Sequence, residues 1–190
     1  MPDPLSSTPI SPPTETPRAL TRPAGEPWMR NTHLDLDPVC RAVLHALELV
    51  GEDTDRWCAG LSTAEIHARP GNLPPVAFHL RHIARSLDRL LTYAEDRALD
   101  ETQLAALGSE MESTQPASTV LSQFREGLAH AEQRLRQFAP EHLADPRGIG
   151  RQHLPTTVAG LLIHCAEHSQ RHLGQAITTA KLVLAGRNSG

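Results

Sequence analysis

The sequence is poor in aromatic residues, and this scarcity limits how a core can be built from it. Phe, Trp and Tyr make up 3 % of the 190 residues, whereas hydrophobic residues of all kinds make up 39 %. The core must therefore consist mainly of Leu, Ala, Val and Ile, and runs of β-branched residues are few. Such a composition is typical of helices. The length fits one domain and is too short to argue for two.

Cysteine, targeting segments and basic surfaces are also scarce. Cys40, Cys58 and Cys165 are odd in number and show no CxxC spacing, which favours free, mostly buried thiols in a reducing compartment over a disulfide framework. No signal-peptide core and no run long enough to span a bilayer is present. The net charge of −4, with both signs interspersed, excludes a basic nucleic-acid-binding face. We expect a cytoplasmic protein without a nucleic-acid or membrane partner.

Proline is concentrated at the N-terminus. Half of the 16 prolines lie within residues 1–27, separated by Ser and Thr rather than by a periodic apolar pattern. Such a segment buries too little apolar surface to offset the entropy lost on ordering it. We predict a flexible tail over residues 1–30, a folded domain over 31–186 and a C-terminal tail over 187–190.

Four long helical patterns follow the tail. They cover residues 37–51, 75–97, 118–139 and 156–186. Asp37 is the predicted N-cap of the first helix and Gly51 its predicted end, while Thr156 or Thr157 caps the last helix. No credible β-strand pattern appears. The sequence predicts an all-α four-helix bundle with an up-down-down-up or similar topology.

Histidine is the most unusual feature, with 11 copies, three of which recur every fourth residue in the last predicted helix. His168 and His172 lie on the apolar arc of that helix, His164 lies at its edge, and Gln175 shares the face. The apolar residues of this arc are Leu154, Val158, Leu161, Cys165, Ala176, Thr179 and Val183. Two imidazoles at i and i+4 can reach one metal ion, which would remove the cost of burying them unpaired. The alternative is that each imidazole forms a local hydrogen bond or is partly exposed.

The second predicted helix offers a third nitrogen. In its stretch FHLRHIARS, His79 and His82 border the apolar stripe, and spacing alone does not choose between them. Three protein nitrogens with a position left for solvent are typical of a catalytic metal site, because structural zinc sites are filled by four protein ligands.

The last helix also carries a second apolar arc. Its members are Ala166, Leu173, Ile177, Ala180 and Leu184. A helix that is apolar on two faces must be covered twice, so we expect a homodimer.

Two motifs make residues 34–186 similar to the DinB-like superfamily of metalloenzymes, which includes the YfiT-type proteins. They are HLRHIARS in the second helix and HCAEHSQRHLGQ in the last helix. The resemblance implies a divalent cation held by one histidine of the second helix and two of the last, namely His82, His168 and His172. It also implies that His79 and His164 lie beside these ligands and that Gln175 has a supporting role.

The resemblance further implies an activity. Superfamily members of known activity join a low-molecular-weight thiol to an electrophile, or use such a thiol to isomerise a substrate. A cation with neutral ligands and open positions favours a bound thiolate. We therefore expect a metal-dependent thiol S-transferase that uses a thiol such as bacillithiol, mycothiol or glutathione. The alternatives are a hydrolase that uses metal-bound water, and a metal-stabilised binding protein without activity.

The identity of the cation and the contacts of the thiol are less constrained. Zn²⁺ and Ni²⁺ are the first candidates and Fe²⁺ and Mn²⁺ the alternatives, since three imidazoles suit all four. Arg85 belongs to a basic line with Arg81 and Arg89 beside the His82 face, and it is the candidate to bind a carboxylate of the thiol. The alternative is a solvated helix face paired with Asp88 and Glu95.

Overall fold

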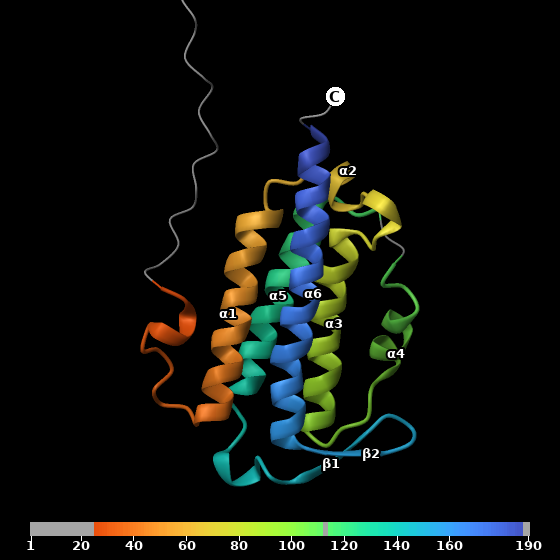
Figure 1. Ribbon diagram of the computed structural model, residues 1–190. Coiled ribbons are helices and arrows are strands. Elements are labelled where there is room, and N and C mark those ends of the chain that lie inside the picture. The colour runs from red at the N-terminus through yellow and green to blue at the C-terminus, as the bar shows by residue number, and fades with distance from the viewer. Residues whose placement is uncertain (1–24, 112–113, 188–190) are drawn as a thin grey trace, which may run out of the picture.

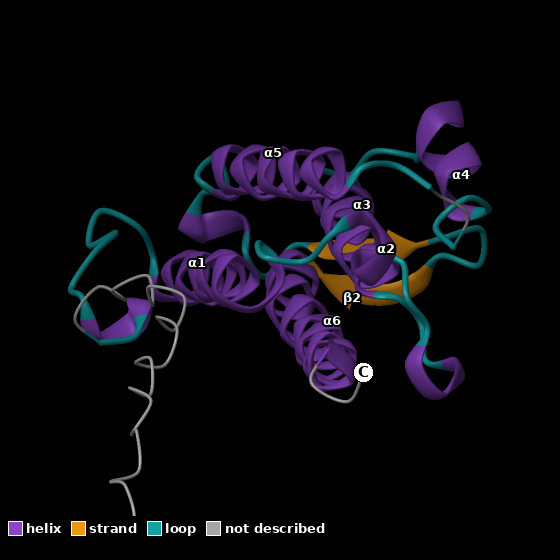
Figure 2. Cartoon of the chain, turned by 90° about the horizontal axis from the view of Figure 1, so that it is seen from above, coloured by secondary structure: helices purple, strands orange, loops and turns teal. Residues whose placement is uncertain are grey.

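The computed structural model describes residues 25–111 and 114–187, and four long helices dominate it (Figure 1). They are α1 (Pro38–Cys58), α3 (Val76–Ala94), α5 (Ala117–Leu135) and α6 (Val158–Arg187). The chain runs up in α1, down in α3 and α5, and up again in α6. Helix α6 packs between α1 and α3, and α5 contacts α3 and α1 behind it (Figure 2). The predicted four-helix bundle and its up-down-down-up topology are confirmed.

Shorter elements connect the long helices. They are α2 (Thr63–Ile66), α4 (Glu101–Leu107), 3₁₀ turns at Pro27–Met29, Pro70–Asn72 and Pro140–His142, and an antiparallel hairpin of β1 (Pro146–Ile149) and β2 (Leu154–Thr157). The prediction that the chain has no strand is therefore wrong. Leu154, expected on the buried arc of the last helix, lies in β2 and is 55 % exposed. Two strands of four residues are too short to give a recognisable alternation of apolar and polar residues.

Helix α1 continues through Gly51, where the sequence predicts its end. The buried stripe of the helix extends beyond that point through Thr54 and Cys58, so packing outweighs the roughly 1 kcal/mol by which glycine disfavours a helix. A Cβ atom on Gly51 would lie 3.4 Å from Leu128 of α5. This is an ordinary van der Waals distance, so the packing of α1 against α5 does not require glycine at this position.

The predicted N-cap Asp37 is confirmed, and of the two candidates for the cap of the last helix the structure selects Thr157 over Thr156. The Asp37 carboxylate accepts hydrogen bonds from the backbone N–H groups of Val39 and Cys40, and the Thr157 hydroxyl accepts one from that of Gly160. Each cap satisfies N–H groups that have no partner within the first turn of a helix. Local sequence chemistry thus determines where both helices begin.

The ends of the described chain lie against the bundle. Residues 25–30 belong to the segment predicted as a flexible tail, but Pro27 is buried and Arg30 forms an ion pair with Glu52 of α1. The remainder of that predicted tail, residues 1–24, lies outside the described residues. At the other end Arg187 is still helical and pairs with Glu65.

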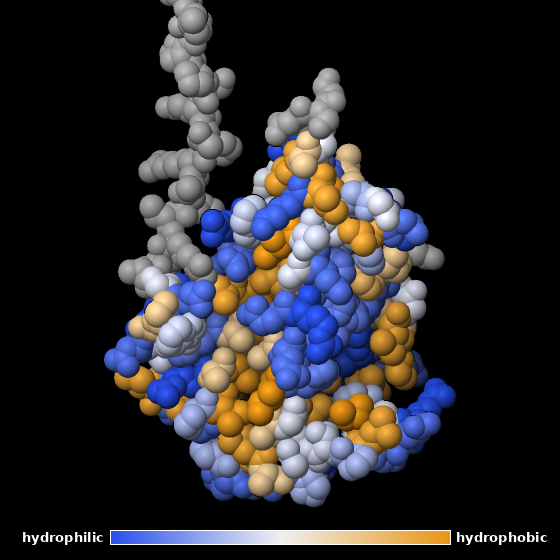
Figure 3. Space-filling view, in the orientation of Figure 1, coloured by the Kyte–Doolittle hydropathy of each residue, from blue (hydrophilic) through white to orange (hydrophobic). Residues whose placement is uncertain are grey.

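The second apolar arc of α6 is covered within the chain. Leu173 and Ala180 are buried, because α6 contacts α1 and α3 on two sides. The outward face of its middle part is polar, with Glu167, Arg171 and Gln175 exposed, and Figure 3 shows polar side chains over the centre of this face. The homodimer therefore stays a prediction for which this arc supplies no argument. None of the described helices is both long and apolar enough to cross a membrane.

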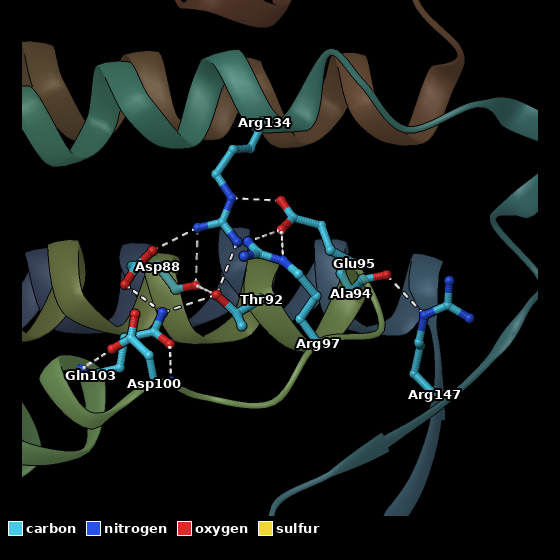
Figure 4. A network of polar contacts seen from close by, with 9 residues as sticks. All are labelled: Asp88, Thr92, Ala94, Glu95, Arg97, Asp100, Gln103, Arg134 and Arg147. Atoms are coloured by element: carbon cyan, nitrogen blue, oxygen red, sulfur yellow. Dashed lines mark hydrogen bonds and ion pairs between the residues drawn. The ribbon is translucent and has the colours of Figure 1, made fainter.

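A half-buried arginine joins α5 to the C-terminal half of α3 (Figure 4). The Arg134 guanidinium lies 2.7 Å from the Asp88 carboxylate, 2.6 Å from that of Glu95 and 3.0 Å from the Thr92 hydroxyl. Gln103 of α4 donates to Asp88 and Thr92 as well. These contacts hold the connection between α3 and α5, to which α4 belongs, against the bundle. A residue further along the same connection, Glu110, contacts His82.

Candidate metal centre

Three imidazoles from two helices converge between α3 and α6. One nitrogen each of His82, His168 and His172 lies within 4.8 Å of the other two. The Nε2 atoms of His82 and His168 are 2.9 Å apart, and the ring centroids of His82 and His172 are 4.3 Å apart. Nitrogens that share a tetrahedral Zn²⁺ ion lie about 3.3 Å apart, given metal–nitrogen distances of about 2.0–2.1 Å. The arrangement therefore fits a divalent cation without a large movement of the helices.

Burial keeps two of these imidazoles neutral. It lowers the pKa of His168 to about 4, with smaller contributions from the nearby His172 and His82, and it also lowers the pKa of His172. A neutral imidazole has one nitrogen with a free lone pair, which is the form that binds a metal. Near neutral pH, His168 and His172 are therefore in the neutral form that can coordinate a cation.

His79 contacts the group from outside. Its Nδ1 atom is 3.2 Å from Nδ1 of His172, and its side chain is buried, which lowers its pKa to about 4. This contact occupies Nδ1 of His172 and leaves its Nε2 for another partner. Spacing alone left His79 and His82 as alternatives for the third nitrogen, the family resemblance implied His82, and the structure brings His82 into the group.

Glu110 is the buried acid of the site, and sequence reasoning missed it. One of its carboxylate oxygens lies 2.5 Å from Nδ1 of His82, and the other accepts a hydrogen bond of 3.0 Å from Arg89. Burial acts to raise the pKa of Glu110, but the hydrogen bonds from His82 and Arg89 outweigh it and lower that pKa. A carboxylate at Nδ1 leaves Nε2 of His82 free to bind a cation, an arrangement common around metal-bound histidines.

The two residues predicted to support the site lie at its margin. The His164 ring centroid is 5.4 Å from that of His168, and its Nδ1 atom is 3.6 Å from the Glu167 carboxylate. Gln175 is exposed and lines a neighbouring cavity of about 340 Å³, which His79 and Arg171 also line. Neither His164 nor Gln175 provides one of the three converging atoms.

Arg85 and Arg89, two members of the basic line of α3, have partners other than those considered from the sequence. Arg85 donates hydrogen bonds to the carbonyl of Ala106 and to the Ser109 hydroxyl, at 3.0 and 3.3 Å. Asp88 and Glu95, the expected partners of this line, instead bind Arg134. Arg85 thus fastens the end of α4 to α3.

The cysteines offer no nucleophile. Cys40, Cys58 and Cys165 are all free and fully buried, and burial raises the pKa of each thiol to about 12. A thiol with such a pKa is almost entirely protonated at neutral pH. Any thiolate in this site must therefore come from a bound molecule.

A second group of possible ligands lies between α1 and the segment before it. His33, His45 and Glu48 bring three atoms within 4.8 Å of one another. His33, however, is already bonded at both ring nitrogens, to Glu48 at 2.6 Å and to Arg136 at 2.8 Å. A guanidinium in contact with the group disfavours a further positive charge, so its hydrogen bonds account for it.

Comparison with known protein families matches residues 46–176 to the family described as the DinB superfamily. The match covers more than half of the chain and includes all three converging histidines. No curated protein and no solved structure matches the chain.

Proposed function

The chain belongs to the DinB superfamily, and on this basis we propose that it binds a divalent cation and uses it to transfer a low-molecular-weight thiol to an electrophile. One observation carries the proposal. His82 donates from Nδ1 to Glu110, so its Nε2 has a lone pair, and this atom lies 2.9 Å from Nε2 of His168 and near a nitrogen of His172. A cation among these atoms satisfies all three at once.

The residues around the group have roles that follow from their contacts. A cation with three neutral ligands supplies a positive charge that lowers the pKa of a bound thiol. Glu110 holds His82, His79 holds His172, and the Phe78 ring stacks on the His82 ring at 5.5 Å. The cavity of about 340 Å³ beside His79 has the size of a small-molecule site and offers room for the electrophile.

The thiol has to be a separate small molecule, because the three cysteines of the chain are buried. We propose bacillithiol, mycothiol or glutathione, with the reaction located in the cytoplasm. Zn²⁺ or Ni²⁺ is the proposed cation, with Fe²⁺ and Mn²⁺ as alternatives. Arg85 remains the proposed partner of a thiol carboxylate, through the N–H groups that it does not use for Ala106 and Ser109.

The proposal is tested by a thiol-conjugation assay on protein purified without nickel affinity. We expect elemental analysis to find one divalent ion per chain, and conjugation to cease with a chelator and to return when the ion is restored. Absence of turnover with all three thiols and a broad set of electrophiles would contradict thiol transfer. Hydrolysis of simple esters without a thiol would favour a hydrolase, and a cation that only raises the melting temperature would favour a binding protein.

Glu110→Gln should weaken binding of the cation by roughly 10–100-fold, the usual effect of losing a charged group behind a metal-binding histidine. The amide keeps the shape of the side chain but removes the negative charge that orients His82 and neutralises Arg89. Competition with a chromophoric chelator measures the change. Glu110→Asp should recover part of the affinity, and Glu101→Gln, on the exposed surface of α4, should leave it unchanged. Equal affinities of the Glu110→Gln and Glu101→Gln variants would refute this role.

A further inference from the structure

Arg81 is a buried arginine without a hydrogen-bond partner for two of its nitrogens. It lies on α3 and is 6 % exposed, and neither its Nε nor its Nη2 atom has a partner in the part of the chain that the structure describes. Arg89 and Arg134, which also point into the protein, are paired with carboxylates. Leaving buried N–H groups of a charged side chain unpaired is strongly unfavourable, so a missing partner is expected at Arg81.

Among the residues that the structure describes, none supplies a free negative charge to Arg81. The acidic side chain whose charge acts on it is Glu110, but the two oxygens of Glu110 are occupied by His82 and Arg89. Arg85 lies one turn further along the same face of α3 and adds a second positive charge. Within residues 25–111 and 114–187, the two arginines therefore form a region of positive charge that no carboxylate compensates.

This charge borders a cavity. Arg81 and Arg85 line a space of about 290 Å³ between α3 and α5, together with Ala84, Gln123 and Phe124. The ring of Phe124 is buried and offers no hydrogen-bond acceptor, whereas the exposed amide of Gln123 has both an acceptor oxygen and an NH₂ group that can donate to an anion. The cavity is large enough for a small anion and is lined by donors on two helices.

We propose that Arg81 and Arg85 bind a small oxyanion, the carboxylate or phosphate group of a ligand, in this cavity. The planar guanidinium presents paired N–H groups that match the oxygens of either group. None of the three converging imidazoles lines the cavity, so the site is distinct from the candidate metal centre. Arg85 is shared with the proposed thiol contact, so the inference rests on the proposed function at that one residue, whereas the unpaired guanidinium of Arg81 does not depend on thiol transfer.

The test is the melting temperature of the full-length, metal-loaded protein in sulfate, phosphate or acetate against chloride at constant ionic strength. We expect an oxyanion at about a hundredfold above its Kd to raise the melting temperature by roughly 5–10 °C. A larger rise with phosphate and sulfate than with acetate would indicate that the ligand carries a phosphate group, and a larger rise with acetate would indicate a carboxylate. In Arg81→Met this rise should be lost, and the melting temperature in chloride should equal or exceed that of the unmodified protein, since methionine leaves no unpaired N–H group.

Two control variants separate the site from other anion effects. Arg125→Met removes a half-exposed arginine of α5 that pairs with Asp55, and it should keep the full rise. His168→Ala, measured without the cation and compared with its own melting temperature in chloride, should also keep the rise, because the cavity does not include the imidazoles. If Arg81→Met does not fold, Arg85→Gln replaces it and should reduce the rise.

Three results would overturn the proposal. The first is no rise in the unmodified protein, and the second is an equal rise in the Arg81→Met and Arg125→Met variants, which would mean a general salt effect. The third is a rise that persists in Arg81→Met but disappears in His168→Ala, because the anion would then bind the cation of the metal centre. That third result would leave the proposed metal site intact.

Discussion

His168→Ala is expected to abolish stoichiometric binding of a divalent cation, with an affinity more than about a hundredfold below that of the unmodified protein. Loss of a group that merely orients a ligand costs roughly 10–100-fold, and His168 provides one of the three converging nitrogens itself. The two imidazoles that remain, His82 and His172, leave the ion with only two protein ligands, and the lost Nε2 atom is the one that lies 2.9 Å from Nε2 of His82. Elemental analysis and competition with a chelator measure the loss.

His164→Ala is the matched control for this variant. It removes an imidazole one turn earlier on the same helix, whose ring centroid is 5.4 Å from that of His168 but which supplies none of the three atoms. We expect its affinity for the cation to stay within about threefold of the original. Losses of tenfold or more arise from groups that are hydrogen-bonded to a metal ligand, whereas His164 contacts His168 ring to ring. Comparable losses in His164→Ala and His168→Ala would mean that the convergence of the three nitrogens does not hold the ion.

Arg134→Met is expected to lower the free energy of unfolding by about 2–4 kcal/mol, and the melting temperature by roughly 5–12 °C. The substitution leaves the carboxylates of Asp88 and Glu95 and the Thr92 hydroxyl without their guanidinium. We place the value below that of a fully buried pair because Asp88 is 39 % and Glu95 25 % exposed, so water compensates part of the loss. Thermal and urea denaturation of the two proteins measure the difference.

Arg125→Met again serves as the comparison. Its ion pair with Asp55 joins α5 to α1 and is about half exposed on both sides, so its loss should cost less than about 1 kcal/mol. If both arginine variants lose the same stability, the network around Arg134 contributes no more than a surface pair. We also expect weaker cation binding in Arg134→Met alone, because Gln103 of that network anchors the connection that carries Glu110.

The helices with strong local signals could be located from the sequence. Asp37 and Thr157 cap their helices through bonds to residues two or three positions away, and such contacts are determined by neighbours in the chain. The end of α1 could not be located in this way. Glycine at position 51 disfavours a helix locally, but the burial of Thr54 and Cys58 against other helices outweighs that preference.

The hairpin and the connection between α3 and α5 depend on the surrounding protein. The four-residue strands β1 and β2 have almost no pattern of their own, and the hairpin closes beneath α3, where Arg147 donates to the carbonyl of Ala94. Helix α4 has a local signal in its capping box, Asp100 with Gln103, but it has only seven residues and no buried stripe. Short elements of this kind are stabilised by tertiary contacts more than by their own composition.

The sequence by itself determined the helical class, the caps and the pairing of His168 with His172, because a spacing of four residues places two side chains on one face of any α-helix. Spacing could not choose between His82 and His79, and the choice of His82 came from the motif resemblance until the tertiary structure placed it in the group. Only the tertiary structure decided that Glu110 lies behind His82 and that Arg81 has no partner among the described residues. These contacts join residues far apart in the chain, His82 and His168 being 86 positions apart. The packing of α6 between α1 and α3 brings them together, and no local pattern encodes its angle or depth.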